Sequence, residues 1–208
     1  MAMTTMWTAD LWFDPSCPYT WRTARWLREV TQVRPVRVSW HVMSLSVLNE
    51  GRDDDPEGDP EGFLWYPVRV CAAVRRQYGE DALRRFYTAL WAPHERGEQD
   101  WIDGLDSGLR AAGLPAELAE AGGSGEYDAD VRASHAEGVA RLGEHAGSPV
   151  LAVSGPDGSS SAVFGPVVSA VPTGADAGRL WDALVLLTAV PGFHELKGPP
   201  RPATLPPP

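Results

Sequence analysis

The segment Asp14-Pro15-Ser16-Cys17-Pro18-Tyr19-Thr20 carries a cysteine at a place suited to chemistry. It follows a short apolar run, Thr8–Phe13, which is typical of a buried strand, and precedes a helical pattern that continues from Trp21. A helix N-terminus carries about half a positive charge and unpaired N–H groups, and both favour the thiolate. The thiolate is the nucleophilic form of cysteine. We therefore expect Cys17 to be reactive, with a pKa below the ordinary thiol value of about 8.5.

The second position that would make this a dithiol site holds Thr20 instead of cysteine. A lone thiol cannot resolve itself, so redox turnover here must pass through a mixed disulfide that an external thiol releases. The Thr20 hydroxyl can donate a hydrogen bond toward the Cys17 sulfur, which favours the thiolate. The chain's other cysteine, Cys71, lies in an apolar stretch with helical character, and we interpret it as a small buried hydrophobe.

Composition excludes several function classes. With 18 basic and 28 acidic residues the net charge is −10, which argues against nucleic-acid binding. The first ten residues lack the features of a signal peptide, and no apolar run approaches the length of a membrane span. We expect a cytoplasmic protein. The cysteines fit no zinc pattern and the acidic loop Gly51–Gly62 lacks regular ligand spacing, so no metal site is predicted.

Patterning along the chain predicts an α/β fold. A helix over Pro18–Val30 separates strands at Thr8–Phe13 and Val36–Val42, which implies a parallel pair with a right-handed crossover. A hairpin is expected from Pro149–Val153 and Ser161–Phe164, with a turn at Gly155–Gly158. The last predicted helix spans Asp176–Val190.

Between these two halves no convincing strand occurs. The segments expected to be helical are Leu64–Tyr78, Asp81–Leu90, Asp100–Ala112, a short piece at Leu114–Leu118, and Asp128–Glu144. This order, β-α-β, helices, then β-β-α, is that of a thioredoxin fold with an inserted all-helical domain. The predicted domains are a thioredoxin-like domain of residues 1–62 and 146–197, a helical insertion of 63–145, and a proline-rich tail of 198–208.

A second piece of the expected site is Gly147-Ser148-Pro149, directly before a strand. In thioredoxin folds a cis-proline at this position faces the active cysteine, and cis X-Pro bonds are uncommon enough to be informative. The backbone of Ser148 is then placed to pair with an extended thiol substrate.

The chain resembles the DsbA-like superfamily, and more closely the actinobacterial mycothiol-dependent nitroreductase group within it. The resemblance extends over nearly the whole sequence. It is carried by Trp12-Phe13-Asp14-Pro15-x-Cys17-Pro18, His41–Leu45, Val47–Asp53, Gly113–Leu118, Phe164–Val167 and Leu180–Ala183. The group's usual motif is Cys-Pro-Trp-Cys, so Thr20 is a departure from it.

The resemblance implies a homodimeric oxidoreductase that takes electrons from mycothiol, or a similar low-molecular-weight thiol, and needs neither flavin nor metal. Cys17, Thr20 and His94 are its expected catalytic residues, His94 as an acid or base near neutral pH. Residues expected to bind the thiol cofactor are Pro18, Asn49, Arg52, Ser148 and Pro149, with Arg52 pairing a carboxylate. An aromatic substrate is expected to stack on Tyr19, with Trp12 and Trp21 walling the pocket.

Two other functions remain open at this stage. Kappa-class glutathione transferases and chromene-carboxylate isomerases share the superfamily and have no resolving cysteine. They resemble this chain in that respect, and their thiol cofactor adds and leaves without net redox. The remaining alternative is a non-catalytic small-molecule binding or resistance protein that keeps only the pocket.

Overall fold

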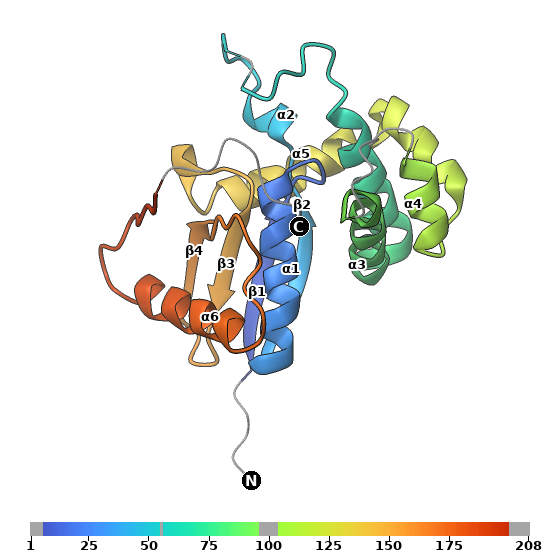
Figure 1. Cartoon of the computed structure of the whole chain (residues 1–208). Coiled ribbons are helices and arrows are strands. Elements are labelled where there is room, and N and C mark those ends of the chain that lie inside the picture. The colour runs from blue at the N-terminus through green and yellow to red at the C-terminus, as the bar shows by residue number, and fades with distance from the viewer. Residues whose placement is uncertain (1–5, 55, 96–103, 200–208) are drawn as a thin grey trace.

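The computed structural model describes residues 6–54, 56–95 and 104–199, apart from the side chains of residues 94, 95 and 144. The strands are β1 (Trp7–Phe13), β2 (Val36–Val42), β3 (Val150–Ser154) and β4 (Ser160–Phe164). The α-helices are α1 (Pro18–Val33), α2 (Leu45–Leu48), α3 (Trp65–Glu95), α4 (Leu105–Ala111), α5 (Asp128–Val139) and α6 (Gly174–Thr188). The 3-10 helices are η1 (Ala116–Gly123), η2 (Gly125–Tyr127) and η3 (Gly143–His145). Figure 1 shows how these elements are arranged.

Within the described residues the strands form a four-stranded sheet in the order β2-β1-β3-β4. β1 runs parallel to β2, and β3 runs antiparallel to both β1 and β4. The β1-α1-β2 unit is the predicted parallel pair with its crossover, and β3-β4 is the predicted hairpin. The predicted order of a β-α-β half, a helical segment and a β-β-α half is confirmed.

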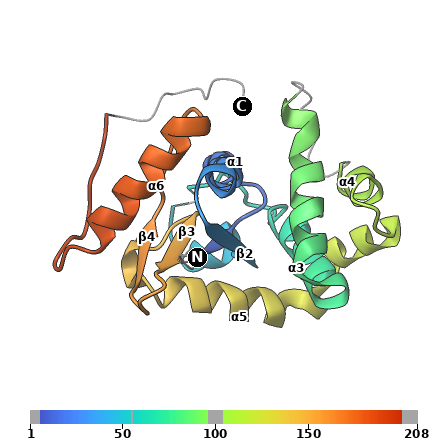
Figure 2. The ribbon, with the colours of Figure 1, turned by 90° about the horizontal axis from the view of Figure 1, so that it is seen from below.

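Different helices cover the two faces of the sheet (Figure 2). α1 lies over one face, between α6 and α3, and α5 crosses the opposite face. Successive residues of a strand point to opposite faces, so Leu11 and Phe13 join the large core under α1 while Trp12 joins Val150 on the α5 side. The side chains of Leu11, Trp12 and Phe13 are all fully buried. β1 pairs with a strand on each side and carries the Cys17 loop at its end.

α5 approaches β1 closely because Gly138 has no side chain. A Cβ at Gly138 would lie 2.7 Å from Cγ of Trp12, closer than atoms can approach. The Trp12 ring also stacks on the His41 ring, with centroids 4.5 Å apart, and the Arg141 guanidinium lies 4.7 Å from its centroid. These contacts bury Trp12 completely.

The segment between the two halves is helical, as predicted, but differs in detail. α3 contains two helical pieces that meet at Gly79 (φ 82°), which agrees with the two helices expected on either side of it. The helix expected over Asp100–Ala112 begins at Leu105, and residues 100–103 lie outside the described residues. The short helix expected near Leu114 is the 3-10 helix η1.

α5 is shorter than predicted. It ends at Val139 rather than continuing to Glu144, and Gly143 follows with φ 61°, in the left-handed region that favours glycine. Leu142 therefore lies in a turn after α5, although its spacing from Val139 is helical. The turn packs Leu142 against the buried cluster of Trp12, Met43, Val150 and Ala152.

Side chains of α3 bind the edge strand β2 at Trp40. The Trp40 N–H donates to Oε1 of Glu80 at 3.0 Å, and the Trp40 carbonyl accepts from Arg75. Both backbone groups that Trp40 turns away from β1 are thereby paired by side chains of α3. Among the described residues, no helix is both long enough and apolar enough to cross a lipid bilayer.

Candidate functional site

Cys17 lies where β1 leads into α1, at the position that caps the N-terminus of the helix. Its backbone is extended (φ −80°, ψ 114°) and its carbonyl accepts the first helical hydrogen bond, from the Trp21 N–H at 3.1 Å. Pro18 follows as the first helical residue, where its missing N–H costs nothing. The predicted junction position of Cys17 is therefore confirmed, and the side chain is 8% exposed.

The loop before β3 supplies the group nearest to the Cys17 sulfur. The Ser148–Pro149 peptide bond is cis, and the thiol donates to the Ser148 carbonyl at 3.6 Å. A second cis bond, Gly165–Pro166, lies beside the first, because the Gly165 N–H donates to the Pro149 carbonyl at 3.0 Å. The expectation that Pro149 is cis and faces the cysteine is confirmed.

The acidity of Cys17 differs from the expectation. Burial raises the pKa of the Cys17 thiol above its ordinary value, although the hydroxyl and N–H of Thr20 act to lower it. The negative charge of Asp14 adds to the increase. The helix N-terminus favours the thiolate, but desolvation disfavours the charged form and outweighs it here. The resting sulfur is a thiol that donates to a carbonyl.

Thr20 and Ser148 form a buried hydroxyl pair. Their oxygen atoms lie 2.7 Å apart, and Ser148 Oγ also accepts from the Asp14 N–H at 3.1 Å. Thr20 is 0% and Ser148 7% exposed. The residue in place of the second cysteine thus bonds to the residue before the cis-proline.

Asp14 is a functional candidate that the sequence pattern does not single out beyond its place in the Cys17 motif. Its carboxylate accepts from the Ser16 N–H and the Leu45 N–H, both at 2.7 Å, and its side chain is fully buried. Burial raises the pKa of Asp14 from 3.8 to about 7, although these N–H groups favour the ionised form. The sequence does hold a signal for the bond to Ser16. An aspartate side chain often accepts a hydrogen bond from the backbone N–H two residues later, and this forms a turn.

Besides the bond from Leu45 to Asp14, a second hydrogen bond fixes the start of α2. The Ser44 N–H donates to Nδ1 of His135 at 3.3 Å, so this nitrogen acts as an acceptor. Burial lowers the pKa of His135, which keeps the ring in the neutral form that can accept. This contact gives His135 a structural role at the start of α2.

The aromatic residues expected to wall the pocket lie elsewhere. Trp12 is buried on the α5 face, and Trp21, which is 1% exposed, stacks on Trp91 in the core beside the Cys17 loop. Because both are buried, neither presents a surface to a substrate, and this expectation is wrong in the structure. Trp91 instead fixes the loop, since its indole N–H donates to the Pro15 carbonyl at 3.1 Å. Tyr19 is half-buried and lies at the start of α1, two residues after Cys17.

Phe164 is an aromatic residue of the site that sequence reasoning missed. Its ring packs on Gly147, where a Cβ would meet Cε2 at 2.7 Å, and it is 41% exposed. Gly147 directly precedes Ser148, whose carbonyl contacts the thiol, so Phe164 flanks the cis-proline loop. A phenylalanine at the end of a strand gave no signal of this, because only the antiparallel pairing of Val150 with Phe164 brings the two segments together.

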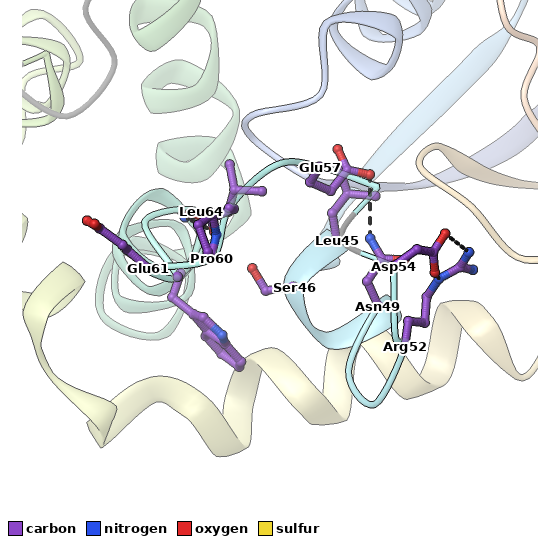
Figure 3. A pocket seen from close by; sticks show the side chains of 12 residues that line it. Leu45, Ser46, Asn49, Arg52, Asp54, Glu57, Pro60, Glu61 and Leu64 are labelled. Atoms are coloured by element: carbon purple, nitrogen blue, oxygen red, sulfur yellow. Dashed lines mark hydrogen bonds and ion pairs between the residues drawn. The ribbon is translucent and has the colours of Figure 1, made fainter.

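Asn49 and Arg52 lie together on a cavity beside this site (Figure 3). The cavity has a volume of about 420 Å³ and is formed by α2, the acidic loop and the start of α3. Arg52 forms a two-pronged ion pair with Asp54, at 2.9 Å for each contact, and the Asn49 amide lies 3.5 Å from Glu57. Leu45, whose N–H is bound by Asp14, also lines the cavity and connects it to the Cys17 loop.

The remaining expectations concern His94, Cys71 and metals. His94 lies in the last turn of α3, and its side chain is outside the described residues. Cys71 is fully buried and Cys17 is not bonded to it, since both cysteines are free. No group of three or more potential metal ligands occurs among the residues that the structure describes.

The profile of the Rv2466c-like family, described as mycothiol-dependent nitroreductase Rv2466c, matches residues 16–198. An uncharacterized protein of Mycobacterium tuberculosis, Rv2286c, is 31% identical over 208 residues, covering 95% of this chain and 84% of that protein.

Two crystal structures share the fold at 18% identity. One is a candidate protein disulfide isomerase from Nitrosomonas europaea, with a TM-score of 0.55 over 87% of this chain and 98% of that one. The other is DsbA2 from Pseudomonas aeruginosa, with a TM-score of 0.52 over 87% and 90%. The fold is thus a DsbA-like thioredoxin fold with a helical insertion. The chain belongs to the Rv2466c-like family of mycothiol-dependent nitroreductases, and with it to the thiol-dependent oxidoreductases.

Proposed function

We propose that this protein is a monothiol oxidoreductase that uses Cys17 and a low-molecular-weight thiol, mycothiol or a close analogue, to reduce small electrophilic or aromatic substrates. The observation that carries the proposal is the position of the Cys17 sulfur, 3.6 Å from the carbonyl before a cis-proline, with Thr20 in place of a resolving thiol. Family membership supports mycothiol as the source of electrons.

The reaction balances with two external thiols. Cys17 and one external thiol are oxidised to a mixed disulfide, and their two electrons and two protons pass to the substrate. A second external thiolate then attacks the external sulfur of the mixed disulfide, and Cys17 leaves as a thiolate. The sum is one external disulfide formed for each two-electron reduction, with Cys17 restored.

Cys71 does not supply the missing resolving thiol in this scheme. It is fully buried, and burial raises its pKa well above the ordinary value for a thiol. Because the thiolate is the attacking species, a buried protonated thiol is a poor resolving group.

The cavity lined by Asn49 and Arg52 is the place that we propose for the rest of the thiol cofactor. Its volume lies within the range of about 300–1,000 Å³ that small-molecule sites occupy. Arg52 is already paired with Asp54, so a ligand group that binds Arg52 would compete with that pair. We also propose, from the family resemblance alone, that the protein acts as a cytoplasmic homodimer, which light scattering tests for the purified chain.

The decisive experiment is mass spectrometry of the reduced protein after incubation with oxidised mycothiol. We expect one mycothiol per chain, mapped to Cys17, in wild type and in the Cys71→Ala control, and none in Cys17→Ser. Substrate reduction should be lost in Cys17→Ser as well. No adduct at Cys17, or full reductase activity in Cys17→Ser, contradicts the proposal.

A second function is favoured by one observation, the raised pKa of Cys17 beside the Thr20–Ser148 hydroxyl pair. If the protein thiol stays protonated, we propose that these hydroxyls activate the sulfur of a bound thiol cofactor, as in a transferase or isomerase without net redox. Mycothiol-dependent turnover that survives in Cys17→Ser and is lost in Thr20→Val selects this alternative.

A further inference from the structure

The hydroxyl of Ser148 has a second neighbour that bears on Cys17. Its oxygen accepts from the Asp14 N–H at 3.1 Å and lies 2.7 Å from the Thr20 hydroxyl oxygen. A serine hydroxyl has one hydrogen to donate and two lone pairs to accept with. The Asp14 N–H occupies only a lone pair of this oxygen, and the Ser148 hydrogen can therefore still be donated to Thr20.

The direction of the Thr20–Ser148 bond depends on the charge of the sulfur. In the resting thiol the S–H donates to the Ser148 carbonyl, and the sulfur needs no donor. A thiolate needs donors, and the Thr20 hydroxyl is one of the groups that lower the pKa of Cys17. When Thr20 donates to the sulfur, its own oxygen must accept from Ser148. The hydrogen bonds then run in one sense, from the Asp14 N–H through Ser148 and Thr20 to the sulfur.

We propose that Ser148 is a positioning residue that stabilises the Cys17 thiolate through the Thr20 hydroxyl. Ser148 orients and polarises the Thr20 O–H, since consecutive hydrogen bonds strengthen one another in a low-dielectric interior. Burial of both hydroxyls excludes water that would otherwise compete for these bonds.

In a monothiol enzyme, this stabilisation matters when an external thiol releases Cys17 from the mixed disulfide. That consequence rests on the proposed function. Release requires an external thiolate to attack the mixed disulfide while Cys17 leaves as a thiolate, and thiols of lower pKa leave faster. The hydroxyl chain therefore assists the departure of Cys17. Thr20 replaces a resolving thiol with a group that makes release by an external thiol easier.

The test is the pH dependence of Cys17 alkylation by iodoacetamide, followed by mass spectrometry of the Cys17 peptide. We expect the pKa to rise by about one pH unit in Thr20→Val and by a similar amount in Ser148→Ala, the size of one hydrogen bond to a charged group. In the double variant Ser148→Ala should add nothing, because Ser148 acts only through Thr20. Ser148→Thr, which keeps the hydroxyl, should restore the wild-type pKa.

Ser134→Ala is the matched control, because the Ser134 hydroxyl donates to the Val42 carbonyl on a different element, and it should leave the Cys17 pKa unchanged. The release of a preformed Cys17 mixed disulfide by excess thiol should slow about threefold in Thr20→Val. Additive effects in the double variant overturn the proposal. An unchanged Cys17 pKa in Thr20→Val also overturns the proposal, whether or not the Ser148→Ala variant folds. These outcomes concern only the thiol, so they are separate from the mycothiol adduct that tests the function.

Discussion

The ring of Phe164 occupies the place that a side chain on Gly147 would fill, with Cε2 2.7 Å from the position of a Cβ there. An aromatic side chain that is 41% exposed thereby lies against the backbone one residue before Ser148. The contact joins the end of β4 to the cis-proline loop, and it places an apolar surface at the edge of the proposed substrate site.

The first prediction concerns this contact. Phe164→Ala should raise the KM for aromatic substrates several-fold with little change in kcat, because the ring contributes binding surface and no reacting atom. Gly147→Ala should give the same result, since the new methyl group displaces the flexible ring. Steady-state kinetics check both. Gly123→Ala, where a Cβ meets nothing within 4 Å, is the control. A loss confined to kcat contradicts the assignment.

Local signals in the sequence were enough to predict the strands and the Cys17 helix, because alternation, proline position and turn residues act over short distances. The cis-proline was predicted from its place in a thioredoxin fold, not from a local signal. The site's finer structure depends on contacts between distant segments. Asp14 bonds to Leu45, and Thr20 bonds to Ser148, 128 residues away. The misplacement of Trp12 has the same origin, since its strand position was right but the face covered by α5 was not evident from the pattern.

The second prediction is a pH dependence of stability at Asp14. Its pKa is about 7 in the folded protein against 3.8 for the ordinary carboxyl, so the folded state binds the proton more tightly. This contribution is fully present below about pH 4 and is lost as pH rises to about 7. It amounts to about 4 kcal/mol at about 1.4 kcal/mol per pKa unit.

Urea unfolding of wild type and Asp14→Asn between pH 4 and pH 8 measures this contribution. The difference in unfolding free energy between the two should shift with pH in the direction that disfavours wild type at high pH. Asp106→Asn, which changes a carboxylate on the surface of α4, is the control and should show no comparable trend. A pH-independent difference between wild type and Asp14→Asn shows that Asp14 is ionised throughout.

The third prediction links Asp14 to Cys17 reactivity. The Asp14 charge contributes to the raised pKa of Cys17, so removing it in Asp14→Asn should lower that pKa. Alkylation of Cys17 at pH 8 should then be faster than in wild type. Cys71 is the internal reference in the same digest, because it is fully buried. Slower alkylation of Cys17 in the variant would falsify the electrostatic argument.

The fourth prediction separates stability from reactivity with two tryptophans. Trp91 donates to the Pro15 carbonyl and Trp26 to the Ala177 carbonyl, both at 3.1 Å and both in the core. Each Trp→Phe change should cost about 1–3 kcal/mol, because it leaves a buried carbonyl unpaired. Only Trp91→Phe should alter the rate at which Cys17 is alkylated, since only that bond holds the Cys17 loop. If Trp91→Phe and Trp26→Phe change the alkylation rate of Cys17 equally, the Trp91 bond does not hold the Cys17 loop.

The pairing of Trp40 with Glu80 and Arg75 has a consequence for association between molecules. An uncovered edge strand is a template on which another chain can add a strand. At β2 the Trp40 backbone groups are already bonded to α3, so a strand adding there would first have to displace two charged side chains. Intermolecular sheet extension, whether in assembly or in aggregation, is therefore directed to the opposite edge of the sheet, where β4 pairs only with β3 among the strands that the structure describes.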